Sequence, residues 1–109
     1  MTRETVGTGA GFLLPAEPVT SLNAWLDAEA GGMGISTAHR IGPDATIDVI
    51  TQSGLRGRGG GGFLTGRKWR SIADQTDMVR YLVVNGAEGE PGTFKDRALL
   101  RANPYQVVE

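Results

Sequence analysis

A glycine run interrupted by cations is the feature that most constrains this chain. Residues 53–69 read SGLRGRGGGGFLTGRKW and hold seven of the 17 glycines, four of them consecutive. A loop without Cβ atoms lets backbone N–H groups approach a ligand closely, and several converging N–H groups bind anions. Arg56, Arg58, Arg67 and Lys68 add positive charge. The stretch predicts a loop that wraps a phosphorylated nucleotide or cofactor; a surface loop without a ligand is the alternative.

Length and charge narrow the classes of protein that fit. With 109 residues the chain makes one domain at most. Its formal net charge of −1 gives no global field that would attract nucleic acid or a membrane surface. The charge is unevenly placed, however, because residues 49–73 carry five cations and no anion. The positive charge therefore belongs to the glycine-rich stretch.

The absence of cysteine excludes several kinds of site within this chain. With no cysteine, it can form no disulfide, no thiolate zinc site and no cysteine-ligated iron–sulfur cluster. The single histidine, His39, has no metal-ligating or catalytic partners nearby and is read as a surface residue. No segment approaches the roughly 20 apolar residues that span a bilayer, and the N-terminus is not a signal peptide. We expect a soluble, cytoplasmic protein.

The first half of the chain predicts a leader and three helices. Residues 1–18 read as a flexible leader with an apolar patch at residues 12–14. Ser21 offers an N-cap for a helix over residues 22–29, ended by two glycines. Pro43 opens a second helix that Gly54 ends, with Ile47, Ile50 and Leu55 facing inward, although its Val, Ile and Thr content also fits a strand. A third helix, from residue 65 towards 75, would aim its N-terminal N–H groups into the basic loop.

The second half predicts one buried strand and two helices. Residues 78–85 read MVRYLVVN, a continuous apolar run typical of a buried strand, and end at an Asn-Gly turn signal. A loop with two carboxylates follows, then a helix over residues 95–102 and another that begins at Pro104. In the first half of the chain, the apolar residues of 31–40 show no clear helical or strand period. Because the chain stops inside the last apolar turn, we expect the first part of a longer protein.

Short nucleotide-binding motifs do not identify the fold by themselves. Gly57, Gly59 and Gly62 satisfy G-x-G-x-x-G, but four consecutive glycines make that match nearly automatic. No strand is predicted directly before it, as a standard Rossmann unit requires. The phosphate-binding pattern that ends in Gly-Lys-Ser/Thr fails because Lys68 precedes Trp69. The Arg-Gly-Gly sequence resembles an RNA-binding box, which leaves an RNA binder as a remote alternative.

The loop after the predicted strand supplies a second set of polar groups. Asn85, Glu88 and Glu90 follow the end of the strand, where open α/β sheets bind ligands. The amide of Asn85 suits a flavin pyrimidine edge, and carboxylates suit ribose hydroxyls. Solvated turn charges are the alternative for Glu88 and Glu90. Together, a basic glycine-rich loop and an acidic loop indicate a cofactor cleft.

Both loops carry long motifs that resemble one family. SGLRGRGGGGFLTGRKW, followed by YLVVNGAEGEPGTFKDRALL, is similar to the 51 kDa flavoprotein family of respiratory complex I and its relatives in NAD-reducing hydrogenases and formate dehydrogenases. The resemblance covers residues 45–109. It implies an α/β fold that is Rossmann-like without being a standard Rossmann fold, with residues 19–109 as the N-terminal part of an FMN/NADH-binding domain truncated at its C-terminus.

The resemblance implies NADH oxidation by FMN, with a hydride passing from nicotinamide to flavin and electrons leaving through iron–sulfur partners. It assigns FMN contacts to Gly57, Gly59, Lys68, Asn85 and Glu88, and NADH contacts to Gly60, Phe63 and Glu90; Arg58, Gly61 and Gly62 complete the cofactor loop. The flavin carries the chemistry, so no residue here is expected to be catalytic.

Several positions depart from the family pattern. Ala87 replaces an Asp and removes one acceptor from the flavin site, as in the related C subunit of the Rnf complex. Leu64 replaces a Pro, and the Phe that usually follows the Lys-Trp-Ser run is replaced, since the chain here reads Lys68-Trp69-Arg70-Ser71. The cysteines of the family's 4Fe-4S cluster and its later cofactor contacts would lie beyond Glu109. Alternatives are therefore an Rnf-like or diaphorase subunit, or a non-catalytic fragment that docks on redox subunits. We expect no nucleic acid, no metal held by this chain and no direct membrane span; attachment to a membrane would be peripheral, through partner subunits.

Overall fold

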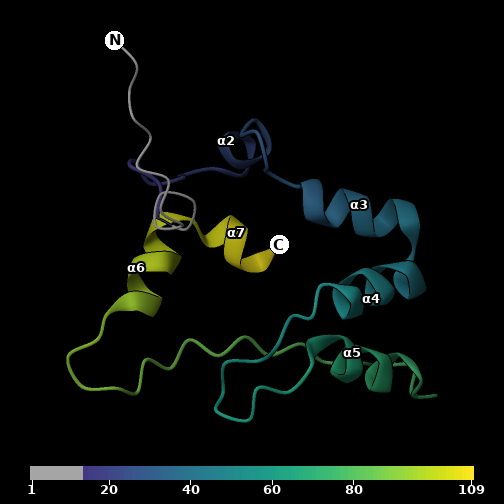
Figure 1. Cartoon of the computed structure of the whole chain (residues 1–109). Helices are drawn as coiled ribbons and strands as arrows, with labels where there is room; N and C mark the ends of the chain where they lie inside the picture. Colours follow the sequence, from purple (N-terminus) through teal and green to yellow (C-terminus); the bar gives the residue numbers. More distant parts are fainter. Residues whose placement is uncertain (1–13) are drawn as a thin grey trace. The chain divides into compact units, whose positions relative to one another are not determined.

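The computed structural model describes residues 14–109, and every regular element in that range is a helix (Figure 1). In chain order the helices are α2 (Leu22–Leu26), α3 (Met33–Ile41), α4 (Pro43–Gln52), α5 (Thr65–Ala73), α6 (Lys95–Ala102) and α7 (Pro104–Val108). The apolar residues Phe12 and Leu13 of the predicted leader lie outside the described residues. Residues 14–109 divide into two compact units, which are described separately.

The unit of residues 35–82 is built on α4 and α5, which lie side by side (Figure 1). Pro43 stands at the start of α4, where its missing N–H costs nothing, and Gly42 before it has a φ of 84° that favours glycine. Ile47 is 6% exposed between the helices. Gly66, in the first turn of α5, is buried against α4. A Cβ at this position would overlap the Thr51 side chain and lie 2.7 Å from the Thr51 Cα. The two helices can therefore approach this closely only with glycine at position 66.

The unit of residues 14–34 and 83–109 joins α2 to the end of the chain. The Ser21 hydroxyl accepts a hydrogen bond from the Ala24 N–H (3.1 Å) and caps α2, as its sequence predicts. The Glu109 carboxylate accepts hydrogen bonds from the Trp25 indole N–H (2.9 Å) and from the backbone N–H groups of Gly32 and Gly34 (2.7 Å each). These bonds tie α2, the turn after it and the first turn of α3 to Glu109, the residue that follows α7.

The buried strand predicted for residues 78–85 is wrong for this structure. Residues 79–85 have no regular element, and Met78, Tyr81, Leu82 and Val83 are between 87% and 95% exposed. A strand is stable only when neighbouring backbone pairs with its N–H and C=O groups, and no partner lies alongside within the described residues. The expected α/β class is therefore not confirmed, since the described part of the chain is helical.

Other elements agree with their sequence signals or depart from them for local reasons. The predicted helices starting at Pro43, Thr65, Lys95 and Pro104 are confirmed. The first helix ends at Leu26 and not at residue 29. Helix α3 was missed because Gly34, Ser36 and Thr37 are weak helix formers by intrinsic propensity. Leu55 was predicted to face inward but is 50% exposed, since it lies after α4 has ended.

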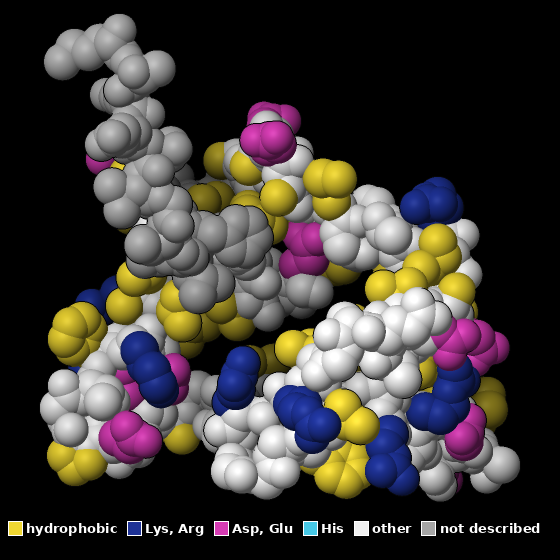
Figure 2. Space-filling model, in the orientation of Figure 1, with side chains coloured by type: hydrophobic (Ala, Val, Ile, Leu, Met, Phe, Trp, Pro, Cys, Tyr) yellow, Lys and Arg dark blue, Asp and Glu magenta, His cyan; other side chains and the backbone are white. Residues whose placement is uncertain are grey.

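Large apolar side chains are widely exposed in the described part of the chain (Figure 2). Only Ile47 among its hydrophobic residues is buried. Asn103 is buried and polar, and its side-chain oxygen accepts a hydrogen bond from the Gln106 N–H (3.2 Å) at the start of α7. Exposed apolar surface of this extent is typical of faces that another segment or protein covers.

The contact between Gly66 and Thr51 yields a stability prediction. Gly66→Ala should lower the stability of the chain by about 1–3 kcal/mol, because the new methyl group forces α4 and α5 apart. Gly59→Ala is the matched control, since a Cβ there meets nothing within 4 Å. Thermal unfolding followed by far-UV circular dichroism measures both. Equal midpoints for the two variants would show that the helices do not pack as described.

Candidate functional site

The glycine-rich stretch forms a closed loop between α4 and α5. The Gly57 N–H donates to the Phe63 carbonyl (2.8 Å) and the Thr65 N–H donates to the Leu55 carbonyl (2.9 Å). Between these two bonds, Arg56 and Leu64 pair as an antiparallel bridge. The arrangement is a short hairpin whose tip holds residues 58–62. The sequence predicts a loop here, and the structure adds that its two arms are hydrogen-bonded to each other.

The tip of this loop leaves its backbone donors open. Within the described residues, none of the N–H groups of residues 58–62 donates a hydrogen bond. A Cβ added at residues 59–62 would meet nothing within 4 Å, so the space beside the backbone is empty. Gly60 and Gly62 have φ values of 85° and 54°, which side chains disfavour. Open N–H groups in such a turn are suited to an anion such as a phosphate.

Cations flank the tip along the sequence, and most of them have no acidic partner in the described residues. Arg56 donates to the Gly62 carbonyl (3.0 Å) and so also holds the loop in shape. In the described part of the chain, Arg58, Arg67 and Lys68 form no ion pair. The Lys68 Nζ lies 5.9 Å from the centre of the Phe63 ring, within the range of a cation–π contact. The Phe63 ring is 52% exposed, which leaves it accessible to a ligand.

Arg70 differs from the other cations of the stretch because it is used internally. Its guanidinium bonds to the Asp44 carboxylate (2.6 Å) and contacts the Asp48 carboxylate at 3.3 Å, which links α5 to α4. The hydrogen bond with Asp44 raises the pKa of Arg70 above its ordinary value. Exposed ion pairs of this kind stabilise a fold little. Arg70 is therefore a helix contact, and the positive charge open to a ligand is that of Arg58, Arg67 and Lys68.

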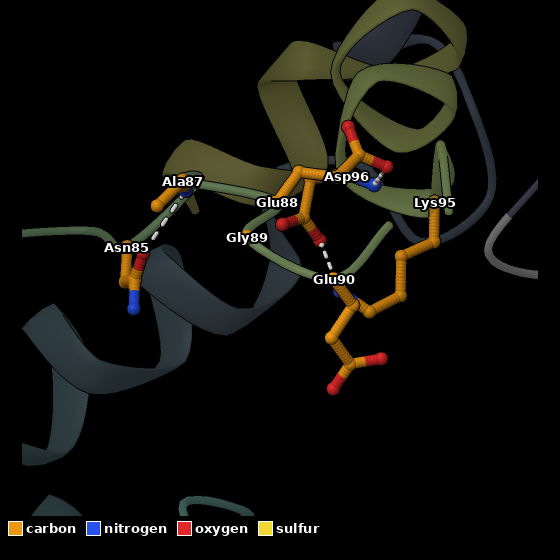
Figure 3. A pocket seen from close by; sticks show the side chains of 7 residues that line it. All are labelled: Asn85, Ala87, Glu88, Gly89, Glu90, Lys95 and Asp96. Atoms are coloured by element: carbon orange, nitrogen blue, oxygen red, sulfur yellow. Dashed lines mark hydrogen bonds and ion pairs between the residues drawn. The ribbon is translucent and has the colours of Figure 1, made fainter. Parts of the chain in front are cut away.

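The second predicted loop lines a cavity of about 270 Å³ (Figure 3). All three polar residues predicted from the sequence, Asn85, Glu88 and Glu90, lie on it. The remaining lining residues are Ala87, Gly89, Lys95 and Asp96. Lys95 and Asp96 were missed as site residues. Their position in the first turn of α6, directly after the loop, is the signal that could have indicated them.

Polar contacts inside this cavity fix some side chains and leave others available. The Asn85 side-chain oxygen accepts a hydrogen bond from the Ala87 N–H (3.0 Å), which closes a local turn. Lys95 pairs with the Asp96 carboxylate (3.0 Å), and this hydrogen bond raises the pKa of Lys95 above its ordinary value. Glu90 is exposed, and its side chain makes no hydrogen bond or ion pair among the described residues. The cavity thus presents the Asn85 amide nitrogen and the Glu90 carboxylate.

Glu88 behaves differently from its neighbours. Its carboxylate is 8% exposed and accepts hydrogen bonds from the Asp96 N–H (3.1 Å), the Arg97 N–H (3.3 Å) and the Arg97 Nε (3.2 Å). Its backbone φ of 48° lies in the left-handed region, which costs a non-glycine residue roughly 1–2 kcal/mol. Hydrogen bonds to a charged group contribute about 1.5–3 kcal/mol each, enough to offset that cost.

The predicted site residues fall into two separate groups. Gly57, Arg58, Gly59, Gly60, Gly61, Gly62, Phe63 and Lys68 lie together in the unit of residues 35–82, and Asn85, Glu88 and Glu90 lie together in the other unit. Across residues 14–109, no group of three or more His, Cys, Asp or Glu side chains could hold a metal ion. None of the helices described is long and apolar enough to cross a membrane.

Comparison with known proteins decides the family. Residues 50–109, which include both loops, match the model of the Nuo51 FMN-binding domain. The chain belongs to this family. The resemblance to the 51 kDa flavoprotein subunits of complex I is thereby confirmed, and the match begins in α4 and continues to Glu109.

Individual relatives within the family match most of this chain. It is 43% identical over 84 residues to an F subunit of NADH-quinone oxidoreductase from Rhizobium meliloti, covering 74% of this chain and 20% of the relative. It is 49% identical to the corresponding F subunit of Streptomyces coelicolor, over 72% of this chain and 18% of the relative. To the mitochondrial NADH-ubiquinone oxidoreductase 51 kDa subunit of Neurospora crassa it is 51% identical, over 62% of this chain and 15% of the relative. The chain thus spans about a fifth or less of these relatives. No solved structure matches it.

The left-handed glycine at the loop tip gives a test of the hairpin. Gly60→Ala should open the loop, because alanine at a φ of 85° costs roughly 1–2 kcal/mol. Hydrogen exchange at the Gly57 amide, which the Phe63 carbonyl protects, should then accelerate about tenfold. Gly61→Ala adds the same methyl group into equally open space without a positive φ, and should exchange like wild type. An unchanged rate in Gly60→Ala would exclude the closed hairpin.

Proposed function

We propose that this chain contributes to the FMN- and NADH-binding site of an NADH-oxidising flavoprotein subunit that passes electrons to an iron–sulfur partner. The observation that carries the proposal is the closed glycine loop, whose N–H groups at residues 58–62 are open and whose flanking cations Arg58, Arg67 and Lys68 have no acidic partner in the described residues. The family supports it, because its model is that of an FMN-binding domain.

The residues present fit a flavin mononucleotide in chemical terms. A phosphate monoester needs several donors and positive charge, and the glycine loop offers both beside empty space. A flavin ring needs donors and acceptors along its pyrimidine edge, and the free amide nitrogen of Asn85 can donate there. We assign FMN contacts to Gly57, Gly59, Lys68 and Asn85, and to Glu88 through its backbone, since its carboxylate is bonded to the first turn of α6.

NADH requires an apolar platform and polar groups for its riboses. The half-exposed Phe63 ring offers a surface against which an aromatic ring can stack, and the Glu90 carboxylate is free to accept hydrogen bonds from hydroxyl groups. We assign NADH contacts to Gly60, Phe63 and Glu90, and we place Arg58, Gly61 and Gly62 in the loop that surrounds both cofactors.

This chain's residues bind and orient, while bound FMN supplies the hydride and electron chemistry. Lys68, whose Nζ lies 5.9 Å from the centre of the Phe63 ring, would favour negative charge on a flavin bound beside it. The glycine tip keeps side chains out of the space that a ring system would fill. We further propose that any 4Fe-4S cluster is held outside this chain, which has no cysteine, and that partner subunits hold the assembly at the membrane surface.

Docking without catalysis is a second candidate, and one observation favours it. Residues 78–84 form an extended apolar segment whose large side chains are 62% to 95% exposed. An extended segment with open backbone groups can add a strand to a sheet in another segment or protein. In that case the chain binds a partner redox subunit and carries no flavin.

Flavin content separates the two candidates. The chain and any longer product of its gene are purified and their FMN content is measured by absorbance and fluorescence. We expect roughly one FMN in the longer product and none in the 109-residue chain, because the chain spans only a fifth of its relatives. Absence of FMN from both, after reconstitution with FMN, would contradict the proposed function and leave docking.

Two substitutions test the assigned contacts in the longer, flavin-loaded product. Lys68→Ala and Glu90→Ala should each lower the rate of NADH oxidation roughly tenfold or more, since each removes charge-assisted hydrogen bonds of about 1.5–3 kcal/mol. Arg40→Ala and Glu29→Ala are the matched controls, because both side chains are exposed and neither residue belongs to either loop. Steady-state kinetics with a soluble electron acceptor measures the effect. Wild-type rates in Lys68→Ala and Glu90→Ala would contradict the residue assignments.

A further inference from the structure

Glu88 is the only non-glycine residue with a positive φ in the part of the chain that the structure describes. Its side chain is also nearly inaccessible, with 8% of it exposed, although it lies in a loop on the surface. A carboxylate in such a loop normally points into solvent. Both features need a local cause, and the contacts of the side chain supply one.

The Glu88 carboxylate supplies the missing N-terminal cap of α6. The residue in the N-cap position, Phe94, has no side chain that can accept a hydrogen bond. Glu88 instead reaches the helix from eight residues upstream and accepts a hydrogen bond from the Asp96 N–H (3.1 Å) (Figure 3). It also accepts one from the Arg97 N–H (3.3 Å). A negative charge at this end of a helix is also favoured by the helix dipole.

The Arg97 side chain completes the anchor. Its Nε donates to the Glu88 carboxylate at 3.2 Å, so one oxygen receives both the Arg97 backbone and the Arg97 side chain. With both oxygens engaged and little surface open, the carboxylate has no room to bind a ligand. Glu88 as a residue still lines the cavity together with Asn85 and Glu90.

We propose that Glu88 is a positioning residue that locks residues 85–90 onto the first turn of α6, and that its carboxylate does not touch the cofactor. The inference rests on the proposed function, and it deepens it by assigning how this residue contributes. The left-handed turn at Glu88 sets the direction of the chain between Asn85, whose amide nitrogen is available, and Glu90, whose carboxylate makes no hydrogen bond among the described residues. Loss of the anchor frees that turn and misplaces both.

A direct contact and an anchor predict different results. A carboxylate beside the flavin would change the midpoint potential of bound FMN when its charge is removed, because the charge acts on the reduced and oxidised forms differently. An anchor would instead change FMN affinity together with the stability of α6. Because Arg97 belongs to the same anchor, the effects of removing Glu88 and Arg97 would not add up.

The test uses the longest product of the gene that binds FMN, with the variants Glu88→Ala, Glu88→Gln, Arg97→Met and Glu88→Ala/Arg97→Met. Measurements are the FMN dissociation constant by fluorescence quenching, the midpoint potential of bound FMN, and hydrogen exchange at the Asp96 and Arg97 amides without FMN. Arg101→Met, on the same helix and exposed, is the control for loss of a surface cation.

We expect Glu88→Ala to weaken FMN binding about tenfold and to accelerate exchange at both amides, with the midpoint potential unchanged. Arg97→Met should weaken binding less, and the double variant should bind no more weakly than Glu88→Ala. Glu88→Gln, which keeps one acceptor, should fall between wild type and Glu88→Ala and serves if Glu88→Ala does not fold. Arg101→Met should match wild type.

Three results would overturn the inference alone. A shifted midpoint potential with normal amide exchange would make Glu88 a direct flavin contact. Faster exchange with unchanged FMN affinity would make it merely structural, and additive effects of the two single variants would separate Glu88 from Arg97. A wild-type protein that binds no FMN would instead overturn the proposed function, and this inference would fall with it.

Discussion

The packing of Gly66 against Thr51 is the contact on which the glycine loop depends. Gly66 lies in the first turn of α5 and Thr51 in the last turn of α4, so their contact brings together the two ends of the loop. Only then can the Leu55 carbonyl meet the Thr65 N–H and the Phe63 carbonyl meet the Gly57 N–H. The loop tip, with its open donors, is a consequence of a helix pair that tolerates no side chain at one position.

The cations of the glycine-rich stretch differ in whether an acidic side chain pairs with them. In the unit of residues 35–82, Asp44 and Asp48 bind Arg70. Arg58, Arg67 and Lys68 form no ion pair within the described residues. Exposed ion pairs add little to stability. The distribution of charge therefore matters more for the three cations that stay unpaired than for the pairs that form. A loop with unpaired N–H groups and unpaired cations is suited to a phosphorylated ligand.

The exposed apolar surface is consistent with the small fraction of its relatives' length that this chain spans. It spans about a fifth or less of its relatives, and within residues 14–109 only Ile47 among the hydrophobic residues is buried. The extended residues 78–84 show the same feature, with large apolar side chains next to open backbone groups. Faces of this kind are covered when further chain or a partner is present.

The sequence alone determined the helix starts at Pro43, Thr65, Lys95 and Pro104, the glycine loop and the family, because capping, proline placement and long motifs are local signals. It did not determine the state of residues 78–85, since a strand exists only through its neighbours, nor α3, whose residues are weak helix formers. Only the tertiary structure showed that Leu55 is exposed, that Lys95 and Asp96 line the cavity and that the Glu88 carboxylate caps α6. Those facts depend on contacts between residues distant along the chain or on a turn that no local pattern specifies.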